Sequence, residues 1–249
     1  MNPLKIVAVS YLNTYPFVYG IKESGFLQDY RLELAIPALC ADRISSDGAD
    51  IALVPAGALP VIGKVFPLSD YCIGAVNKVK TVLLLSHQPL TKISTICLDF
   101  DSRTSVQLVK VLAKHHWKIK PGYKKLEPGE AAKLNSGEAV VAIGDKTFAI
   151  RNQYPYQYDL AEEWIQFTGL PFVFALWVSR MQLPEVITRP FTDALAYGVS
   201  HIPECLNYFS EKLPPGEDSL GYLLNNISFI LDERKHQGLN LFLKYMQDL

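Results

Sequence analysis

The sequence predicts an α/β protein of two lobes with a ligand cleft between them. Short apolar runs rich in β-branched residues alternate with helical patterns, which is typical of a mostly parallel sheet covered by helices. Two long extended runs, at 76–86 and 169–179, each join one α/β unit to the next. The chain is therefore expected to cross twice between two lobes, one formed by residues 1–81 and 177–249 and the other by residues 82–176.

The elements of the first lobe follow from its hydrophobic pattern. A continuous apolar run at Leu4–Val9 predicts a buried strand, and the hydroxyl of Thr14 suits the start of a short helix that ends near Glu23. The other predicted elements are a strand at Arg31–Ile36, a helix at Ala38–Ser46, a strand at Asp50–Pro55, a helical turn at Ala56–Ile62 and an all-helical tail at Pro184–Leu249.

The second lobe repeats the strand–helix alternation. An apolar run at Ile93–Leu98 predicts a strand, and apolar residues at helical spacing predict a helix over Thr104–Trp117. The remaining predicted elements are a helix near Pro128–Leu134, a strand at Ala139–Ile143 and a turn at Gly144–Asp145.

Polar loops follow the predicted parallel strands at their carboxyl ends, where open α/β sheets bind their ligands. These loops are Ser10–Asn13, Pro55–Gly57, Asp99–Ser105 and Gly144–Asp145. We expect the four loops to meet at one crevice.

The loop at Asp99–Ser105 is the most informative of these. Three hydroxyls and the guanidinium of Arg103 stand where a strand feeds a helix, and the first N–H groups of a helix have no partner within it. This arrangement suits a bound anion. The alternative is an ordinary helix cap, for which Ser, Thr and Asp are the commonest residues.

Composition and charge narrow the class of protein. The chain is 49% hydrophobic and 20% charged, with a net charge of −1, so neither nucleic acid nor a membrane surface is indicated as a partner. The four cysteines are isolated from one another and from histidines at ligand spacing, which predicts buried thiols, with no disulfide frame and no metal site. No apolar run is long enough for a signal peptide core or a membrane span, and the expected location is cytoplasmic.

Six segments then occur in an order that resembles a known family. They are Ser10–Thr14, Asp50–Pro55, Asp101–Ser105, Ile143–Asp145, Tyr158–Trp164 and Thr168–Val178. Each is weak alone, but together they resemble the chorismate dehydratases of the futalosine route to menaquinone. The resemblance extends from Val7 to the segment 225–229.

The resemblance implies a periplasmic-binding-protein-like (type II) fold used as a cytoplasmic enzyme, in agreement with the two lobes. It implies removal of water from chorismate to give 3-[(1-carboxyvinyl)oxy]benzoate, with no metal or organic cofactor. A related family makes 1,4-dihydroxy-6-naphthoate, typically opens with Ser-Pro-Cys-Pro-Asn-Asp and uses a histidine. Here the opening is Ser10-Tyr11-Leu12-Asn13, which favours the dehydratase. A rival class is a non-catalytic binding protein for a small carboxylate. The oligomeric state is open, with a homodimer as one option.

Chorismate carries two carboxylates, so the cleft must hold a dianion. Ser102, Thr104 and Ser105 are expected to bind one carboxylate, and the opening motif places Ser10 and Tyr11 among the substrate contacts. Arg103 has two interpretations: a bidentate clamp on a carboxylate, or an outward side chain paired with Asp99 or Asp101, and we favour the second.

The catalytic side chains are assigned through the resemblance. The enolpyruvyl carboxylate of the substrate is expected to take the proton itself, while the protein fixes the conformer and stabilises developing charge. Asn13 is expected to orient that carboxylate or the leaving hydroxyl, with a turn-forming role as the alternative. Thr81 stands where the family usually has Ser before Val, and its hydroxyl is expected to contact the substrate.

Three further residues complete the predicted site. Asp145 either polarises the leaving group or caps a helix, and we favour the cap. Thr168 and Gly169 begin the second crossover, where Gly169 is expected to let backbone N–H groups approach the ligand.

Overall fold

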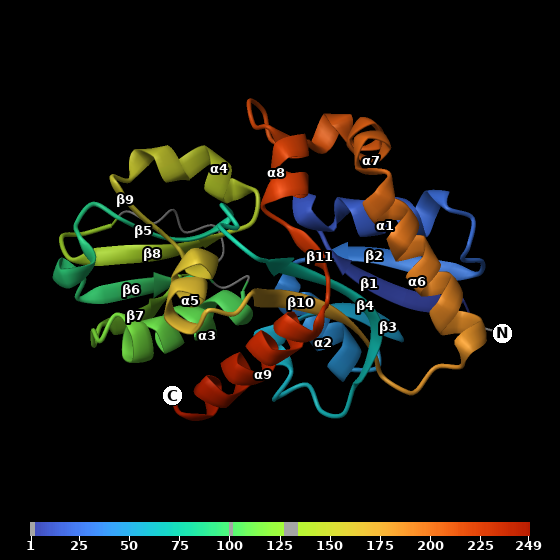
Figure 1. Ribbon diagram of the computed structural model, residues 1–249, viewed down its shortest axis with the longest axis horizontal. Coiled ribbons are helices and arrows are strands. Elements are labelled where there is room, and N and C mark those ends of the chain that lie inside the picture. Colours follow the sequence, from blue (N-terminus) through green and yellow to red (C-terminus); the bar gives the residue numbers. More distant parts are fainter. Residues whose placement is uncertain (1–2, 100–101, 127–133) are drawn as a thin grey trace.

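The computed structural model describes residues 3–99, 102–126 and 134–249. Two β-sheets lie side by side, each with its own helices, and two connecting segments run between them (Figure 1). The first sheet has the strand order β11-β4-β10-β3-β1-β2, and the second has the order β7-β6-β8-β5-β9. This mixed α/β architecture confirms the predicted fold class. The expectation of mostly parallel sheets was wrong, because antiparallel pairs are as prominent as parallel ones in both sheets.

The first sheet combines parallel and antiparallel strands. Its strands are β1 (Leu4–Val9), β2 (Tyr30–Ala35), β3 (Ile51–Pro55), β4 (Phe66–Ala75), β10 (Phe172–Ser179) and β11 (Ser228–Ile230). Strand β1 is parallel to β2 and β3, whereas β10 is antiparallel to β3 and β4. The carboxyl ends of β1 and β3 therefore open on the same edge, which faces the second sheet.

Helices from both ends of the chain pack on the first sheet. They are α1 (Tyr15–Glu23), α2 (Pro37–Ser45), α6 (Glu185–Ser200), α7 (Ile202–Tyr208), α8 (Ser219–Asn225) and α9 (Glu233–Gln247). Two 3-10 turns, η1 (Leu12–Thr14) and η2 (Ala56–Ala58), follow β1 and β3. Helices α1 and α6 approach closely at Gly20 and Gly198, where an added Cβ would overlap the facing backbone. The C-terminal tail thus completes the lobe begun by the N-terminus.

The second sheet is smaller and is built from the middle of the chain. Its strands are β5 (Val82–Ser86), β6 (Thr95–Leu98), β7 (Gly122–Lys125), β8 (Glu138–Ile143) and β9 (Tyr156–Asp159). Its helices are α3 (Thr104–Val111), α4 (Lys146–Ile150) and α5 (Leu160–Thr168). Strand β6 is parallel to β8, so α3 and α4 begin at the same edge, which faces the first sheet.

The two crossovers differ from the predicted extended runs. Strand β4 ends at Ala75 and β5 begins at Val82, so residues 76–81 are a link and not the start of a strand. Strand β10 begins at Phe172 and pairs within the first sheet over its whole length, earlier than the predicted boundary at 177. The division of the chain into 1–81 with 177–249 and 82–176 otherwise stays a prediction.

Two local predictions need correction, and a third falls almost entirely on residues that the structure does not describe. The tail is not all-helical, because β11 pairs with the edge of β4, and three residues are too few to show a strand pattern in the sequence. Helix α3 ends at Val111 and continues as a π-helical turn over Leu112–His116. The predicted helix near Pro128–Leu134 lies outside the described residues apart from Leu134, which is not helical.

Large apolar side chains fill the core of both lobes. Trp164, Trp177, Phe172 and Phe242 are almost completely buried and pack edge to face with aromatic neighbours. All four cysteines are buried, and burial raises the pKa of Cys40 to about 12. In the described part of the chain, no helix has both the length and the apolar character of a membrane span.

Candidate active site

A cleft between the two sheets gathers the ends of the strands predicted to form the site. Its space not filled by atoms, including the part that opens to solvent, is about 520 Å³. The polar side chains that line it are Tyr11, Asn13, Thr14, Thr81, Ser102, Thr104 and Ser105. The apolar residues are Val9, Pro37, Pro55, Ile73, Val79, Val82, Ile143, Phe174 and Ala175.

Several helices begin at this cleft. Thr14 precedes α1, Pro37 opens α2, Ser102 lies just before α3, and Gly144 lies just before α4. The first N–H groups of a helix lack partners within it and carry partial positive charge. No lysine, arginine, histidine, aspartate or glutamate occurs among the described lining residues. The arrangement can therefore hold an anion through N–H groups, hydroxyls and one amide.

The start of α3 presents two serines to the cleft. The Ser102 hydroxyl oxygen accepts a hydrogen bond from the Ser105 N–H at 2.9 Å, which caps the helix and leaves the Ser102 proton free to be donated. Both serines are buried, and no hydrogen-bond partner of the Ser105 hydroxyl occurs within residues 3–99, 102–126 and 134–249. Ser102 and Ser105 thus lie where the predicted carboxylate contact needs them.

Thr104, between them, has a different partner set. Its hydroxyl donates to the Phe174 carbonyl oxygen at 2.9 Å and accepts from the Gly57 N–H at 3.0 Å. An added Cβ at Gly57 would lie 2.7 Å from the Arg103 carbonyl oxygen, so the backbones of η2 and α3 are in direct contact. Thr104 lines the cleft, but its hydroxyl joins the two lobes and is not available to grip a carboxylate as the sequence suggested.

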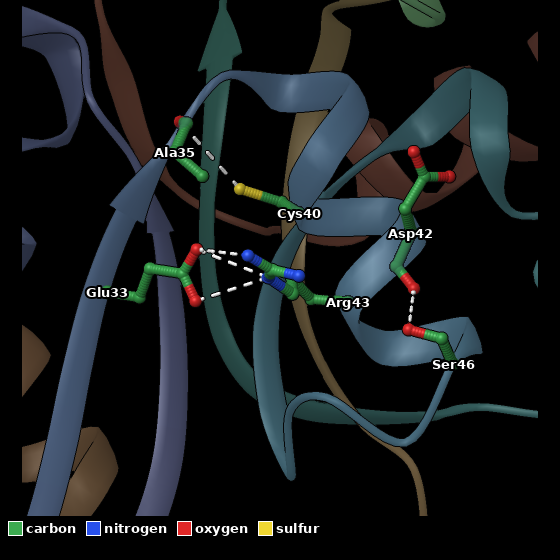
Figure 2. A network of polar contacts seen from close by, with 6 residues as sticks. All are labelled: Glu33, Ala35, Cys40, Asp42, Arg43 and Ser46. Atoms are coloured by element: carbon green, nitrogen blue, oxygen red, sulfur yellow. Dashed lines mark hydrogen bonds and ion pairs between the residues drawn. The ribbon is translucent and has the colours of Figure 1, made fainter.

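Arg103 points away from the cleft. Its guanidinium pairs with Asp42 of α2, and Figure 2 shows the Asp42 carboxylate directed away from the neighbouring Glu33–Arg43 pair. The Arg43 guanidinium meets Glu33 at 3.0 Å. Arg103 is therefore not a substrate clamp in this geometry. It occupies the favoured outer position with an unpredicted partner, since Asp99 instead pairs with Lys146 at 2.6 Å.

Asn13 and Thr81, the predicted catalytic side chains, lie on the opposite wall. The Thr81 hydroxyl is 2.8 Å from the phenol oxygen of Tyr222. Asn13 Oδ1 accepts from the Thr14 hydroxyl at 3.2 Å. Sequence reasoning missed Tyr222, because it lies on α8 in the tail and no local motif marks it.

Asp145 lies at the edge of the cleft and binds the loop after β1. Its carboxylate accepts the Leu12 N–H at 3.0 Å and 3.2 Å. Burial raises the pKa of Asp145 to about 6, although the hydrogen bond from the Leu12 N–H lowers this pKa in part. The adjacent Gly144 has φ +67°, and an added Cβ would lie 2.8 Å from the Tyr11 ring. Asp145 therefore links the lobes beside the site, and its carboxylate is not among the lining groups.

Three predicted residues lie away from the cleft. Ser10 donates its N–H to the Ala35 carbonyl and does not line the pocket. Thr168 donates to the Trp164 carbonyl at 2.8 Å, and Gly169 ends α5 in the left-handed region with its carbonyl accepting from Arg234. The prediction for Thr168 and Gly169 was wrong about position, because the second crossover reaches the cleft only further along β10.

Comparison with solved structures places the molecule in a class. A Candida albicans protein described as having the generic periplasmic binding protein structural fold matches all of this chain and 91% of its own, with a TM-score of 0.71 at 13% identity. A protein of Archaeoglobus fulgidus matches 99% of this chain and 97% of its own, with a TM-score of 0.77 at 11% identity. The fold is that of periplasmic binding proteins, as predicted.

Comparison with sequence families assigns the chain to a narrower group of proteins than the fold does. A model described as menaquinone biosynthesis matches residues 4–248, and the chain belongs to that family. A curated relative, the chorismate dehydratase of Thermus thermophilus, is 26% identical over 262 residues, which cover 97% of this chain and 94% of the relative. The resemblance found in the sequence is thereby confirmed.

Proposed function

We propose that this protein is a chorismate dehydratase of the futalosine route to menaquinone. It removes water from chorismate to form 3-[(1-carboxyvinyl)oxy]benzoate. The observation that carries the proposal is a cleft lined by hydroxyls, one amide and several helix starts, in a chain of the menaquinone biosynthesis family with a chorismate dehydratase among its relatives. Cytoplasmic location, independence of cofactors and a homodimer stay predictions.

The binding step uses the α3 wall. The Ser102 and Ser105 hydroxyls and nearby N–H groups donate hydrogen bonds to one carboxylate of the dianion, and each hydrogen bond to a charged group contributes about 1.5–3 kcal/mol. Two or three such bonds, added to burial of the ring against Val9, Ile143 and Phe174, suffice for micromolar affinity.

The chemical step breaks the C3–H and C4–O bonds of chorismate and leaves an aromatic ring. The C3–H electron pair forms the new ring double bond, and the C4 hydroxyl departs and combines with a proton as water. As the resemblance to the chorismate dehydratases implies, the enolpyruvyl carboxylate of the substrate takes the C3 proton. The described lining residues, among which there is no carboxylate or imidazole, are compatible with this role of the substrate. Asn13 and Thr81 hold the reactive conformer and donate hydrogen bonds to the developing charge.

The experiment is incubation of the metal-stripped protein with chorismate, followed by chromatography with mass detection. A product lighter by one water, with aromatic absorbance and formed faster than in buffer, supports the proposal. Intact chorismate with saturable heat of binding identifies a carrier instead. Absence of both turnover and binding means that family and fold do not extend to this activity.

A further inference from the structure

Tyr222 lies behind the cleft wall, in a part of the chain remote from its hydrogen-bond partner. It lies on α8, only 2% exposed, and its phenol oxygen is 2.8 Å from the hydroxyl of Thr81 in the first crossover. The hydrogen bond therefore joins the C-terminal tail to a side chain that lines the cleft.

The direction of the hydrogen bond follows from the acceptors within reach. In the part of the chain that the structure describes, Thr81 Oγ1 at 2.8 Å is the hydrogen-bond partner of the buried phenol, so the phenol donates its proton to that oxygen. In this assignment the Thr81 proton is left for a group in the cleft, since its other neighbour, the Val79 carbonyl oxygen, is at 3.4 Å.

Tyr222 remains a neutral donor over the working pH range. Burial raises the pKa of the phenol well above its usual value, and the negative charges of Asp145 and Asp159 add to this effect.

Helix α8, which carries Tyr222, has side-chain contacts with both lobes. The Phe148 ring of α4 packs edge to face against the Tyr222 ring, with centroids 5.3 Å apart. Glu217, just before α8, pairs with Arg151 of the second lobe at 2.8 Å. Asn226, just after α8, donates to the Lys78 carbonyl in the crossover at 2.9 Å. The phenol is therefore held by surroundings that exist only when the lobes are in this arrangement.

We propose that Tyr222 is a positioning residue for the dehydration: it orients the Thr81 hydroxyl as a donor into the cleft. This inference rests on the proposed function. The effect of Tyr222 is exerted through Thr81, because Tyr222 itself is not among the lining residues.

The first test is Tyr222→Phe, with Tyr158→Phe as the matched control. The Tyr158 phenol accepts the Leu90 N–H at 2.8 Å and lies away from the cleft, so the control loses one hydrogen bond elsewhere. We expect Tyr222→Phe to lower kcat about tenfold or more with KM changed less than about threefold, and the control to keep both constants. Equal losses in the two variants, or a kcat within about twofold of wild type, would overturn the proposal.

A double-mutant cycle identifies the route of the effect. Thr81→Val and Tyr222→Phe together are expected to cost much less in kcat than the product of the single losses, because both remove the same contact. Additive losses contradict the proposal.

If Tyr222→Phe fails to fold, Phe148→Leu keeps every hydroxyl while loosening the packing of the Tyr222 ring, and it should lower kcat at an unchanged KM. An unchanged kcat in that folded variant also contradicts it.

A spectroscopic readout separates this inference from the proposed function. With 3-fluorotyrosine at position 222, the ¹⁹F resonance should shift on Thr81→Val and stay in place with Tyr158→Phe. A shift without any turnover of chorismate would retain the hydrogen-bond bridge and reject the dehydratase. Turnover with no shift would retain the dehydratase and reject the role of Tyr222.

Discussion

The two walls of the cleft are built for different tasks. On the α3 wall, the hydroxyls of Ser102 and Ser105 lie beside the start of a helix. The Thr104 hydroxyl on the same wall is hydrogen-bonded to the other lobe. On the opposite wall, Asn13 and Thr81 come from separate elements, and the Thr81 hydroxyl is 2.8 Å from the phenol oxygen of Tyr222. The comparison shows that local backbone geometry places the binding groups of the α3 wall. The side chains of the opposite wall are placed by contacts between segments that are distant in the sequence. Substitutions on the two walls should therefore separate affinity from turnover.

The largest effect is expected from Asn13→Ala on the turnover wall. The substitution removes the amide that orients the substrate, and we expect kcat to fall by about 10²–10³ with a small change in KM. Steady-state kinetics with chorismate measure both constants, and circular dichroism checks the fold. Turnover like that of wild type would remove Asn13 from the mechanism.

A smaller loss is expected from Ser105→Ala on the binding wall. Removal of one hydrogen bond to a carboxylate costs about 1.5–3 kcal/mol, so KM should rise at least about tenfold while kcat stays within about threefold. Calorimetric titration with chorismate gives an independent affinity. If kcat falls and affinity does not, the contrast between the walls is wrong.

Asp145→Asn tests the link between the walls through pH. Burial raises the pKa of Asp145 from 3.8 to about 6, so the folded protein binds this proton more tightly than the unfolded chain. The free energy of unfolding therefore falls as pH rises from about 4 to about 6, and this contribution is constant above that window. Relative to wild type, the variant should gain about 1–3 kcal/mol between pH 4 and pH 7. Denaturant titrations across the window provide the measurement, and parallel curves would show that Asp145 titrates normally.

The smallest effect is expected from Arg103→Ala. The Arg103–Asp42 pair is partly exposed, and such pairs contribute less than about 1 kcal/mol. KM and kcat should each stay within about threefold of wild type, with Asp42→Ala as the matched control. A large rise in KM for Arg103→Ala alone would restore the guanidinium as a substrate clamp.

The sequence located the cleft well because its signals are local. A polar loop directly after a buried strand lies at the ligand edge of the sheet, and this rule placed Asn13 and Ser102 in the cleft. The serines before α3 were predicted as anion ligands for the same reason, from the exposed N–H groups of a helix start.

Other features depend on tertiary contacts that the sequence does not encode locally. Tyr222 contacts Thr81 only because the tail packs between the lobes. The hydroxyl of Thr104 is hydrogen-bonded to the Gly57 N–H on the other side of the cleft. Strand β10 begins at Phe172, later than the predicted start of the extended run at 169. An apolar run indicates that a strand is present, but it does not indicate which residue begins the strand. Thr168 and Gly169 were misplaced by that offset.

The uncharged lining has a consequence for how a dianion would reach the cleft. Long-range attraction by fixed charges accelerates association and weakens steeply as ionic strength rises. A site whose described lining is hydroxyl, amide and backbone N–H acts only at contact distance. Association should therefore depend little on salt, and discrimination between anions would come from the number and direction of donors.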